Sequence, residues 1–275
     1  MDGRQEQRRV GGIEVSVQRG GRGEPLLYLH SASAESSSWN AAFAALADRY
    51  EVIAPAHPGF PGSGGLDRID GIQDLVLHYV EMLDGLGLRS VHLVGSSLGG
   101  WIAAEIASLY PERAGSLVLA GAAGLWLDEA PMREVFGIPP GELAERLFHD
   151  QQHPIAQMLH AAGETTWAVP PDDVLLAFYE STAATARIAW NPYFHNPSLP
   201  GRLGRIGAPT LILWGGEDQL IPLAHGERYR DLIRGAELRT IPACGHLPAI
   251  ERPEAFAAEV VAFLGRHPLP ADKAA

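Results

Sequence analysis

The sequence predicts an α/β protein with a mostly parallel, doubly wound sheet and a helical cap inserted into it. Short apolar runs alternate with longer segments of helical spacing through most of the 275 residues. This alternation is typical of a parallel sheet covered on both faces. Between about residues 125 and 205 no strand-like run appears, and helical segments are punctuated by prolines instead. We therefore assign 1–124 and 206–275 to the core and 125–205 to the cap.

The predicted elements of the core follow in order. Residues 13–17 alternate like a strand, 19–23 have turn composition and 26–29 form a second strand, so a hairpin is expected first. The later predicted strands are 52–54, 91–94, 117–119, 211–213 and 238–241. The predicted helices are 39–48, 70–86, 98–109, 223–234 and 253–265.

Composition excludes several classes of function. The chain has 33 acidic and 21 basic residues, a formal net charge of −12, which opposes binding to nucleic acid or to anionic membranes. It has no apolar stretch of transmembrane length and no secretory signal at its start, so we expect a cytoplasmic protein. Cys244 is the only cysteine, which fits a reducing compartment. The expected partner is a small-molecule substrate, and a homodimer is left open.

A strand-to-helix turn provides the first candidate for chemistry. Gly95-Ser96-Ser97-Leu98-Gly99-Gly100 follows a predicted strand and precedes a predicted helix, and it matches the nucleophile-elbow pattern G-x-S-x-G. Glycines are needed there because the turn is sharp and side chains would crowd it. Centring the pattern on Ser96 would place Val94 and Leu98 where small residues are needed. Ser97 is therefore the predicted nucleophile.

A serine nucleophile needs a base, and the base needs an orienting group. Asp218 follows the predicted strand at 211–213, and His246 follows the one at 238–241. Open parallel sheets place functional loops at the carboxyl ends of their strands, so both side chains are expected near Ser97. We predict that His246 takes the proton of Ser97 and that Asp218 holds the imidazole.

Ser97, Asp218 and His246, in this chain order, resemble the catalytic residues of the α/β-hydrolase superfamily. The similarity runs nearly end to end and includes the strand that ends at His30. The resemblance implies an oxyanion hole made by two backbone N–H groups, which we assign by position to Leu98 and Ala32. The family usually has glycine after that histidine, whereas this chain has Ser31.

Several side chains are candidates for a substrate pocket. Trp126, Trp167 and Trp190 lie in the predicted cap, and together they favour an uncharged, apolar or aromatic substrate. Arg187, also in the cap, is a candidate partner for a substrate carboxylate or for a surface ion pair. The remaining predicted lining residues are His30, Ser31, Phe60 and Leu247.

No cofactor or metal is expected. His149 and His153 have the spacing of a helical zinc site, but the glutamate of that motif is absent and Pro154 follows at once.

The predicted activity is hydrolysis of a small carboxylic ester or lactone through an acyl intermediate on Ser97. One alternative is hydrolysis of a carbon–carbon bond in a vinylogous diketone, as in the related hydrolases of aromatic-ring degradation. Those enzymes commonly carry Asn before the nucleophile and Trp after the triad histidine, whereas this chain has Ser96 and Leu247. Another alternative is a ligand receptor built on a hydrolase fold.

Overall fold

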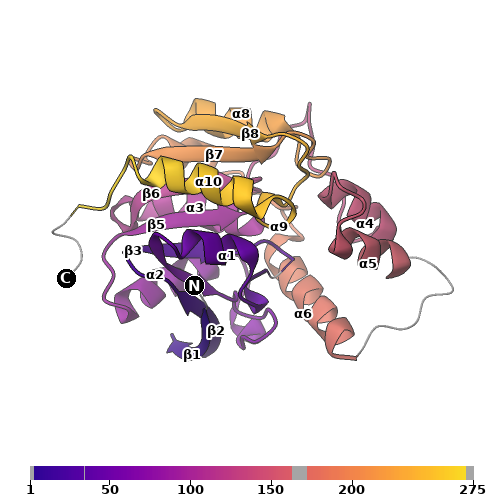
Figure 1. The fold of residues 1–275 in the computed structure, drawn as a ribbon, viewed down its shortest axis with the longest axis horizontal. Helices are drawn as coiled ribbons and strands as arrows, with labels where there is room; N and C mark the ends of the chain where they lie inside the picture. The colour runs from indigo at the N-terminus through magenta and orange to yellow at the C-terminus, as the bar shows by residue number, and fades with distance from the viewer. Residues whose placement is uncertain (1–2, 34, 163–171, 271–275) are drawn as a thin grey trace.

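The computed structural model describes residues 3–33, 35–162 and 172–270. Its centre is an eight-stranded sheet with the order β1-β2-β4-β3-β5-β6-β7-β8 (Figure 1). The strands are β1 (Arg4–Val10), β2 (Ile13–Gly20), β3 (Glu24–Leu29), β4 (Tyr50–Pro55), β5 (Val91–Ser96), β6 (Ala114–Ala120), β7 (Thr210–Gly215) and β8 (Glu237–Ile241). From β4 to β8 all neighbours are parallel, whereas β1–β2 and β2–β4 pair antiparallel. The predicted fold class is confirmed.

Helices cover both faces of the sheet because its strands are apolar on both sides. Along β3, Leu26 and Tyr28 pack on one face and Leu27 and Leu29 on the other. One face carries α1 (Ala41–Leu46) and α10 (Pro253–Leu264), preceded by the short helix α9 (Pro248–Glu251). The opposite face carries α2 (Ile72–Gly85), α3 (Leu98–Leu109) and α8 (Leu223–Leu232). Short 3₁₀ turns lie at η1 (Glu35–Ser37), η2 (Leu66–Arg68) and η3 (Pro111–Arg113).

The predicted opening hairpin is wrong in its pairing. Strand β2 does not pair with β3 but with β1, through the turn at Gly11 and Gly12, and with β4 on its other side. Strand β1 was missed because its sequence, Arg-Gln-Glu-Gln-Arg-Arg-Val, is polar. It lies at the edge of the sheet, where mostly exposed residues do not need an apolar alternation.

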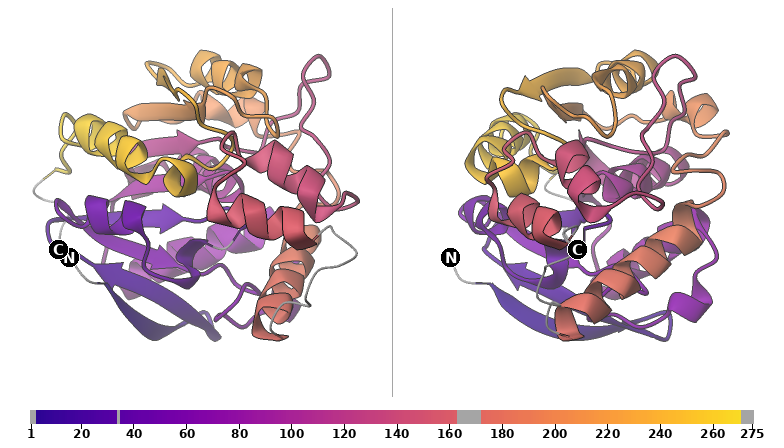
Figure 2. Two further views of the ribbon diagram at one scale, coloured as in Figure 1. Left: turned by 45° about the vertical axis from the view of Figure 1, so that its right-hand side comes forward. Right: turned by 90° about the vertical axis from the view of Figure 1, so that its right-hand side faces the viewer.

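The described secondary structure of the segment 125–205 is helical, and irregular loops connect its helices. It contains α4 (Pro140–Leu147), α5 (Pro154–Ala162) and α6 (Asp172–Ala189), and α7 (Pro200–Leu203) leads back to the core. Both further views show α4, α5 and α6 beyond one end of the strands rather than on the two helical layers (Figure 2). The two ends of the insertion meet, because Gly124 donates its N–H to Phe194 O (2.8 Å) and accepts from Asn196 N (3.1 Å).

A buried carboxylate on α3 binds the chain segment that leads from the cap back to the core. Glu105 is fully buried, and its oxygens accept from Asn196 Nδ2 (2.7 Å), Arg202 Nη2 (2.6 Å) and Trp101 Nε1 (3.2 Å). Helix α3, which begins after Ser97, is therefore hydrogen-bonded to the segment that follows the cap helices. Within the described parts of the chain, no helix is long and apolar enough to cross a membrane.

Candidate active site

The turn from β5 into α3 has the strained geometry that the motif predicts. Ser97 has φ 50° and ψ −112°, outside the favourable regions for a side-chain-bearing residue. The flanking glycines are required by space, since a Cβ on Gly95 would lie 2.3 Å from Gly99 O and one on Gly99 would lie 2.0 Å from Leu29 O. Ser97 is held by its N–H, which donates to Ala120 O at 2.8 Å.

The structure brings Ser97, His246 and Asp218 into one chain of hydrogen bonds. His246 Nδ1 lies 2.8 Å from Asp218 Oδ2, and His246 Nε2 lies 2.8 Å from Ser97 Oγ. A carboxylate can only accept, so Nδ1 carries the proton and Nε2 is left to accept from the serine hydroxyl. All three residues are buried. The arrangement therefore has the parts for nucleophilic catalysis: a hydroxyl, a base within reach, and an acceptor that fixes the base.

Asp218 is itself held in place by two backbone N–H groups. Its Oδ1 accepts from the N–H groups of Leu220 and Ile221, both at 2.9 Å, which leaves Oδ2 for the imidazole. The loop that carries His246 is fixed in a similar way, because Glu217 Oε2 accepts the N–H of Cys244 at 3.0 Å. Burial, reinforced by Glu251, raises the pKa of the Cys244 thiol to about 12, so this cysteine stays protonated.

The loop after β3 compensates for the serine that replaces the usual glycine. Ser31 Oγ donates to Glu35 Oε2 at 2.5 Å, and the Ser31 N–H donates to Glu35 Oε1 at 3.0 Å. Ser31 Oγ also accepts the N–H of Ser33 at 3.0 Å. Among the described residues, the N–H of Ala32 between them has no hydrogen-bond partner, and neither has that of Leu98 at the start of α3. These are the two predicted oxyanion donors.

His30 does not point a titratable group at solvent. It is fully buried and stacks on His57 with ring centroids 3.6 Å apart. His30 Nε2 accepts the His57 N–H, and His57 Nε2 donates to His30 O, both at 2.8 Å. Burial lowers the pKa of His30 and lowers that of His57 further. Both imidazoles are therefore neutral scaffolding, and the ring of Phe60 covers the pair.

Two of the three cap tryptophans predicted to line a substrate pocket are exposed in part, and that role stays a prediction for them. Trp126 is 40% exposed, with its Nε1–H donated to Asp128, and Trp190 is 64% exposed. Trp167 lies outside the described residues. Leu247, another predicted lining residue, directly follows His246 and is buried, and Leu98, the predicted oxyanion donor that follows Ser97, is buried as well.

Arg187 is bound to the core rather than left free for a substrate. Its Nε donates to Ile69 O, and its Nη2 pairs with Asp70. It also lines a groove of about 480 Å³ at the seam between α6 and the glycine-rich loop, together with Gly59 and Glu180. Of the two roles expected for Arg187, these contacts favour the ion pair, and its contact with a substrate stays a prediction.

Sequence reasoning missed the residues of α6 that continue its buried face. Thr185 and Ile188 are buried, and positions 174, 178 and 181 lie on the same side of the helix at its spacing of 3.6 residues. Along that side Val174 is 41% exposed and Phe178 is 46% exposed. Apolar side chains that extend a buried helix face into the open are candidates for substrate contact. The spacing of these residues in the sequence indicates one face of a helix, but spacing does not show where along the helix that face stops being buried.

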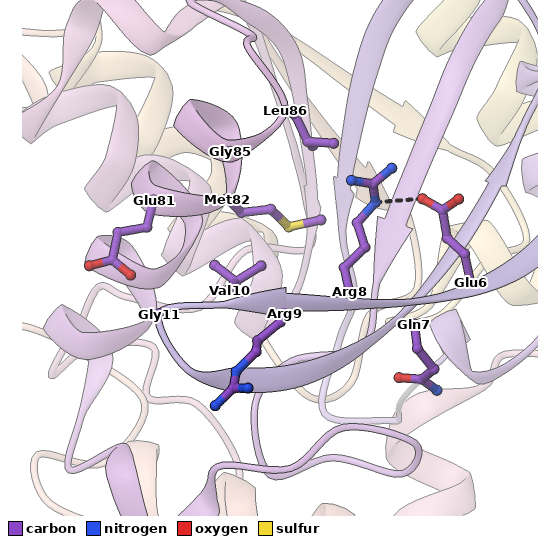
Figure 3. A pocket seen from close by; sticks show the side chains of 10 residues that line it. All are labelled: Glu6, Gln7, Arg8, Arg9, Val10, Gly11, Glu81, Met82, Gly85 and Leu86. Atoms are coloured by element: carbon purple, nitrogen blue, oxygen red, sulfur yellow. Dashed lines mark hydrogen bonds and ion pairs between the residues drawn. The ribbon is translucent and has the colours of Figure 1, made fainter.

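A larger groove, of about 560 Å³, lies elsewhere and contains none of the triad (Figure 3). It runs between β1 and α2, where Arg8 pairs with Glu6.

His149 and His153 do not lie on a helix, because α5 begins at Pro154 after them, and the ring of His153 stacks on Phe148. Within the described residues, no group of three or more His, Cys, Asp or Glu side chains could hold a metal ion.

This sheet and elbow define the class as a hydrolase of the α/β fold. The model of the alpha/beta hydrolase family matches residues 26–259, so the chain belongs to that family. It is 31% identical over 272 residues to 2-hydroxymuconate semialdehyde hydrolase of Pseudomonas sp. strain CF600, covering 92% of this chain and 91% of that protein. It is 28% identical over 271 residues to 2-hydroxy-6-oxo-6-phenylhexa-2,4-dienoate hydrolase of Burkholderia cepacia, covering 92% and 91%.

Solved structures give the same family picture. A meta-cleavage product hydrolase from Pseudomonas fluorescens IP01 superposes with a TM-score of 0.78 at 26% identity, covering 95% of this chain and 97% of that one. A bacterial membrane phospholipase A superposes with a TM-score of 0.75, also at 26% identity, covering 96% and 86%. The fold thus matches hydrolases that act on different bonds.

Proposed function

We propose that this protein uses Ser97 to hydrolyse a carbon–carbon bond in a small vinylogous diketone. The observation that carries the proposal is the similarity, over more than nine-tenths of both chains, to relatives named as hydrolases of 2-hydroxy-6-oxo-dienoates and of 2-hydroxymuconate semialdehyde. The triad geometry supports it, because attack on a ketone needs the same nucleophile and base as attack on an ester.

The proposed reaction balances as a hydrolysis. His246 takes the proton of Ser97 as the serine oxygen bonds to the ketone carbon, and the N–H groups of Leu98 and Ala32 stabilise the oxygen that becomes negative. The carbon–carbon bond then breaks, its electron pair is delocalised onto the second carbonyl as a dienolate, and the leaving carbon takes from His246 the proton that came from Ser97. Water releases the acyl group from Ser97 and restores the enzyme. Conjugation makes the substrate class specific, since an unconjugated carbanion would be a poor leaving group.

Ester hydrolysis is the second candidate, and particular residues favour it. Arg187 is occupied by Ile69 O and Asp70, so it does not offer the cap cation that an anionic dienoate would need. Leu247 follows the base, and the exposed part of the inner α6 face carries Phe178. Burying an unpaired carboxylate among such groups costs several kcal/mol, roughly 3 or more, whereas a neutral ester avoids this.

One comparison separates the two candidates. We would measure kcat/KM for a 2-hydroxy-6-oxo-dienoic acid and for an uncharged aryl ester with the same acyl group, with Ser97→Ala as the blank. Faster cleavage of the diketone acid supports the proposal. Faster cleavage of the ester, with no cleavage of the diketone, would replace it with the second candidate. Absence of multiple turnovers on both would point to the ligand-receptor alternative.

A further inference from the structure

A second buried carboxylate, outside the triad, binds both the loop that carries the base and the cap. Glu251, the last residue of α9, is 5% exposed. Its Oε2 accepts the N–H of Gly245, and its Oε1 accepts the N–H of Asp150, both at 2.6 Å. Gly245 directly precedes the base His246, whereas Asp150 lies in the cap between α4 and α5. One side chain therefore joins the loop of the base to the cap.

A direct contact reinforces this junction. The backbone N–H of His246 donates to Leu147 O, the last carbonyl of α4, at 2.8 Å. The two segments also approach so closely that a Cβ on Gly245 would lie 2.5 Å from Leu147 O and 2.8 Å from His149 N. Figure 2 shows the α9–α10 segment beside these cap helices. The cap segment 147–150 thus packs directly against the backbone of the loop that carries the base.

The consequence for catalysis follows from how the imidazole is held. Its two ring nitrogens make 2.8 Å contacts to Ser97 and Asp218, and those contacts depend on where the backbone of His246 lies. A buried N–H that loses its acceptor is costly, so the carboxylate of Glu251 strongly favours the docked arrangement of both segments. A neutral amide could accept only one of the two N–H groups, because its nitrogen is a donor.

We propose that Glu251 is a positioning residue that couples docking of the cap segment 147–150 to the placement of the base His246. It acts through the backbone of Gly245 and touches none of the triad side chains. Movement of this cap segment would shift the base, so an open cap leaves the serine without its proton acceptor. The inference rests on the Ser97–His246 pair of the proposed function, not on which bond is cleaved.

The test compares Glu251→Gln with a matched control, Glu217→Gln. Glu217 also accepts an N–H of the base loop, from Cys244, but the structure gives it no hydrogen bond to the described part of the cap. The probe is a fluorophosphonate, whose rate of reaction with Ser97 requires the base but no natural substrate. Amide hydrogen exchange is followed by mass spectrometry in segments 147–150 and 243–246.

We expect Glu251→Gln to label about 10- to 100-fold more slowly at every pH, because a displacement of the base by about 1 Å costs this much. Its exchange should rise in both segments. In Glu217→Gln exchange should change little in either segment, because the amide oxygen can still accept the single N–H of Cys244. Glu251→Asp, which keeps two acceptor oxygens, should recover part of the rate, and it replaces the glutamine variant if that variant does not fold.

Three results would overturn the proposal. The first is labelling of Glu251→Gln at the unaltered rate. The second is faster exchange in 243–246 without any change in 147–150, which would mean that the cap is not coupled. The third is faster exchange throughout the sheet, which would make Glu251 a residue of general stability. If the unaltered protein does not label at Ser97, the proposed function fails before this comparison begins.

Discussion

The buried carboxylate of Glu105 offers the sharpest test of what fixes the cap to the core. Glu105→Ala removes the acceptor of Arg202 and Asn196 and leaves the guanidinium of Arg202, whose side chain is only 22% exposed, without its partner. Breaking a buried pair on one side typically costs about 3–5 kcal/mol. Because Arg202 is partly exposed, water compensates in part, and we expect about 3 kcal/mol.

This loss should lower Tm by about 5 °C in a chain of 275 residues. Guanidinium unfolding followed by circular dichroism, together with a thermal scan, measures both quantities. The control is Asp231→Ala, which removes the pair between Arg230 and Asp231, whose side chains are 43% and 55% exposed, and should cost less than about 0.5 kcal/mol. A Glu105→Ala protein within about 1 kcal/mol of the unaltered one would refute the reasoning.

Further predictions concern pH, the cap arginine and the α6 face. Burial lowers the pKa of His78 to about 4, so folding favours its neutral form; stability is complete above about pH 6.5 and falls as the pH drops toward 4, by up to about 3 kcal/mol. Unfolding at pH 7.5 and 5 should show this slope, and His78→Phe should reduce it; an unchanged slope would contradict the assignment. Arg187→Ala loses the contacts with Asp70 and Ile69 and should leave the ratio of kcat/KM for anionic to neutral substrates unchanged. A changed ratio would mean that Arg187 contacts the substrate. Phe178→Ala should raise KM for aryl substrates several-fold, whereas Leu176→Ala, on the opposite side of α6, should leave KM unchanged; an unchanged KM in Phe178→Ala would mean that this face does not contact the substrate.

The elements and the elbow could be predicted because their signals are local. Buried parallel strands need continuous apolar runs, and the turn at Ser97 admits only glycine around it. The positions of Asp218 and His246 followed from topology, because the carboxyl ends of parallel strands share one edge of the sheet. In each case a few neighbouring residues carry the physical constraint.

The residues that the sequence could not place depend on contacts between distant segments. Glu251 accepts the N–H of Asp150, 101 residues earlier in the chain, and nothing near either residue in the sequence indicates that contact. Trp190 and Arg187 were candidates for the pocket on residue type alone, and the side of a cap helix that faces the core is decided by packing. Strand β1 was missed because an edge strand does not need apolar residues. Long-range partners, not local propensity, separate these positions from the ones that were found.

The central claim is that Ser97, activated by His246, is the nucleophile of a hydrolase. The most direct measurement is mass spectrometry of the protein after reaction with a fluorophosphonate. We predict a single adduct on the peptide that contains Ser97, its absence in Ser97→Ala, and a loss of about 10³-fold or more in labelling rate in His246→Ala. An adduct on any other residue, or labelling of Ser97→Ala at the unaltered rate, would contradict the account.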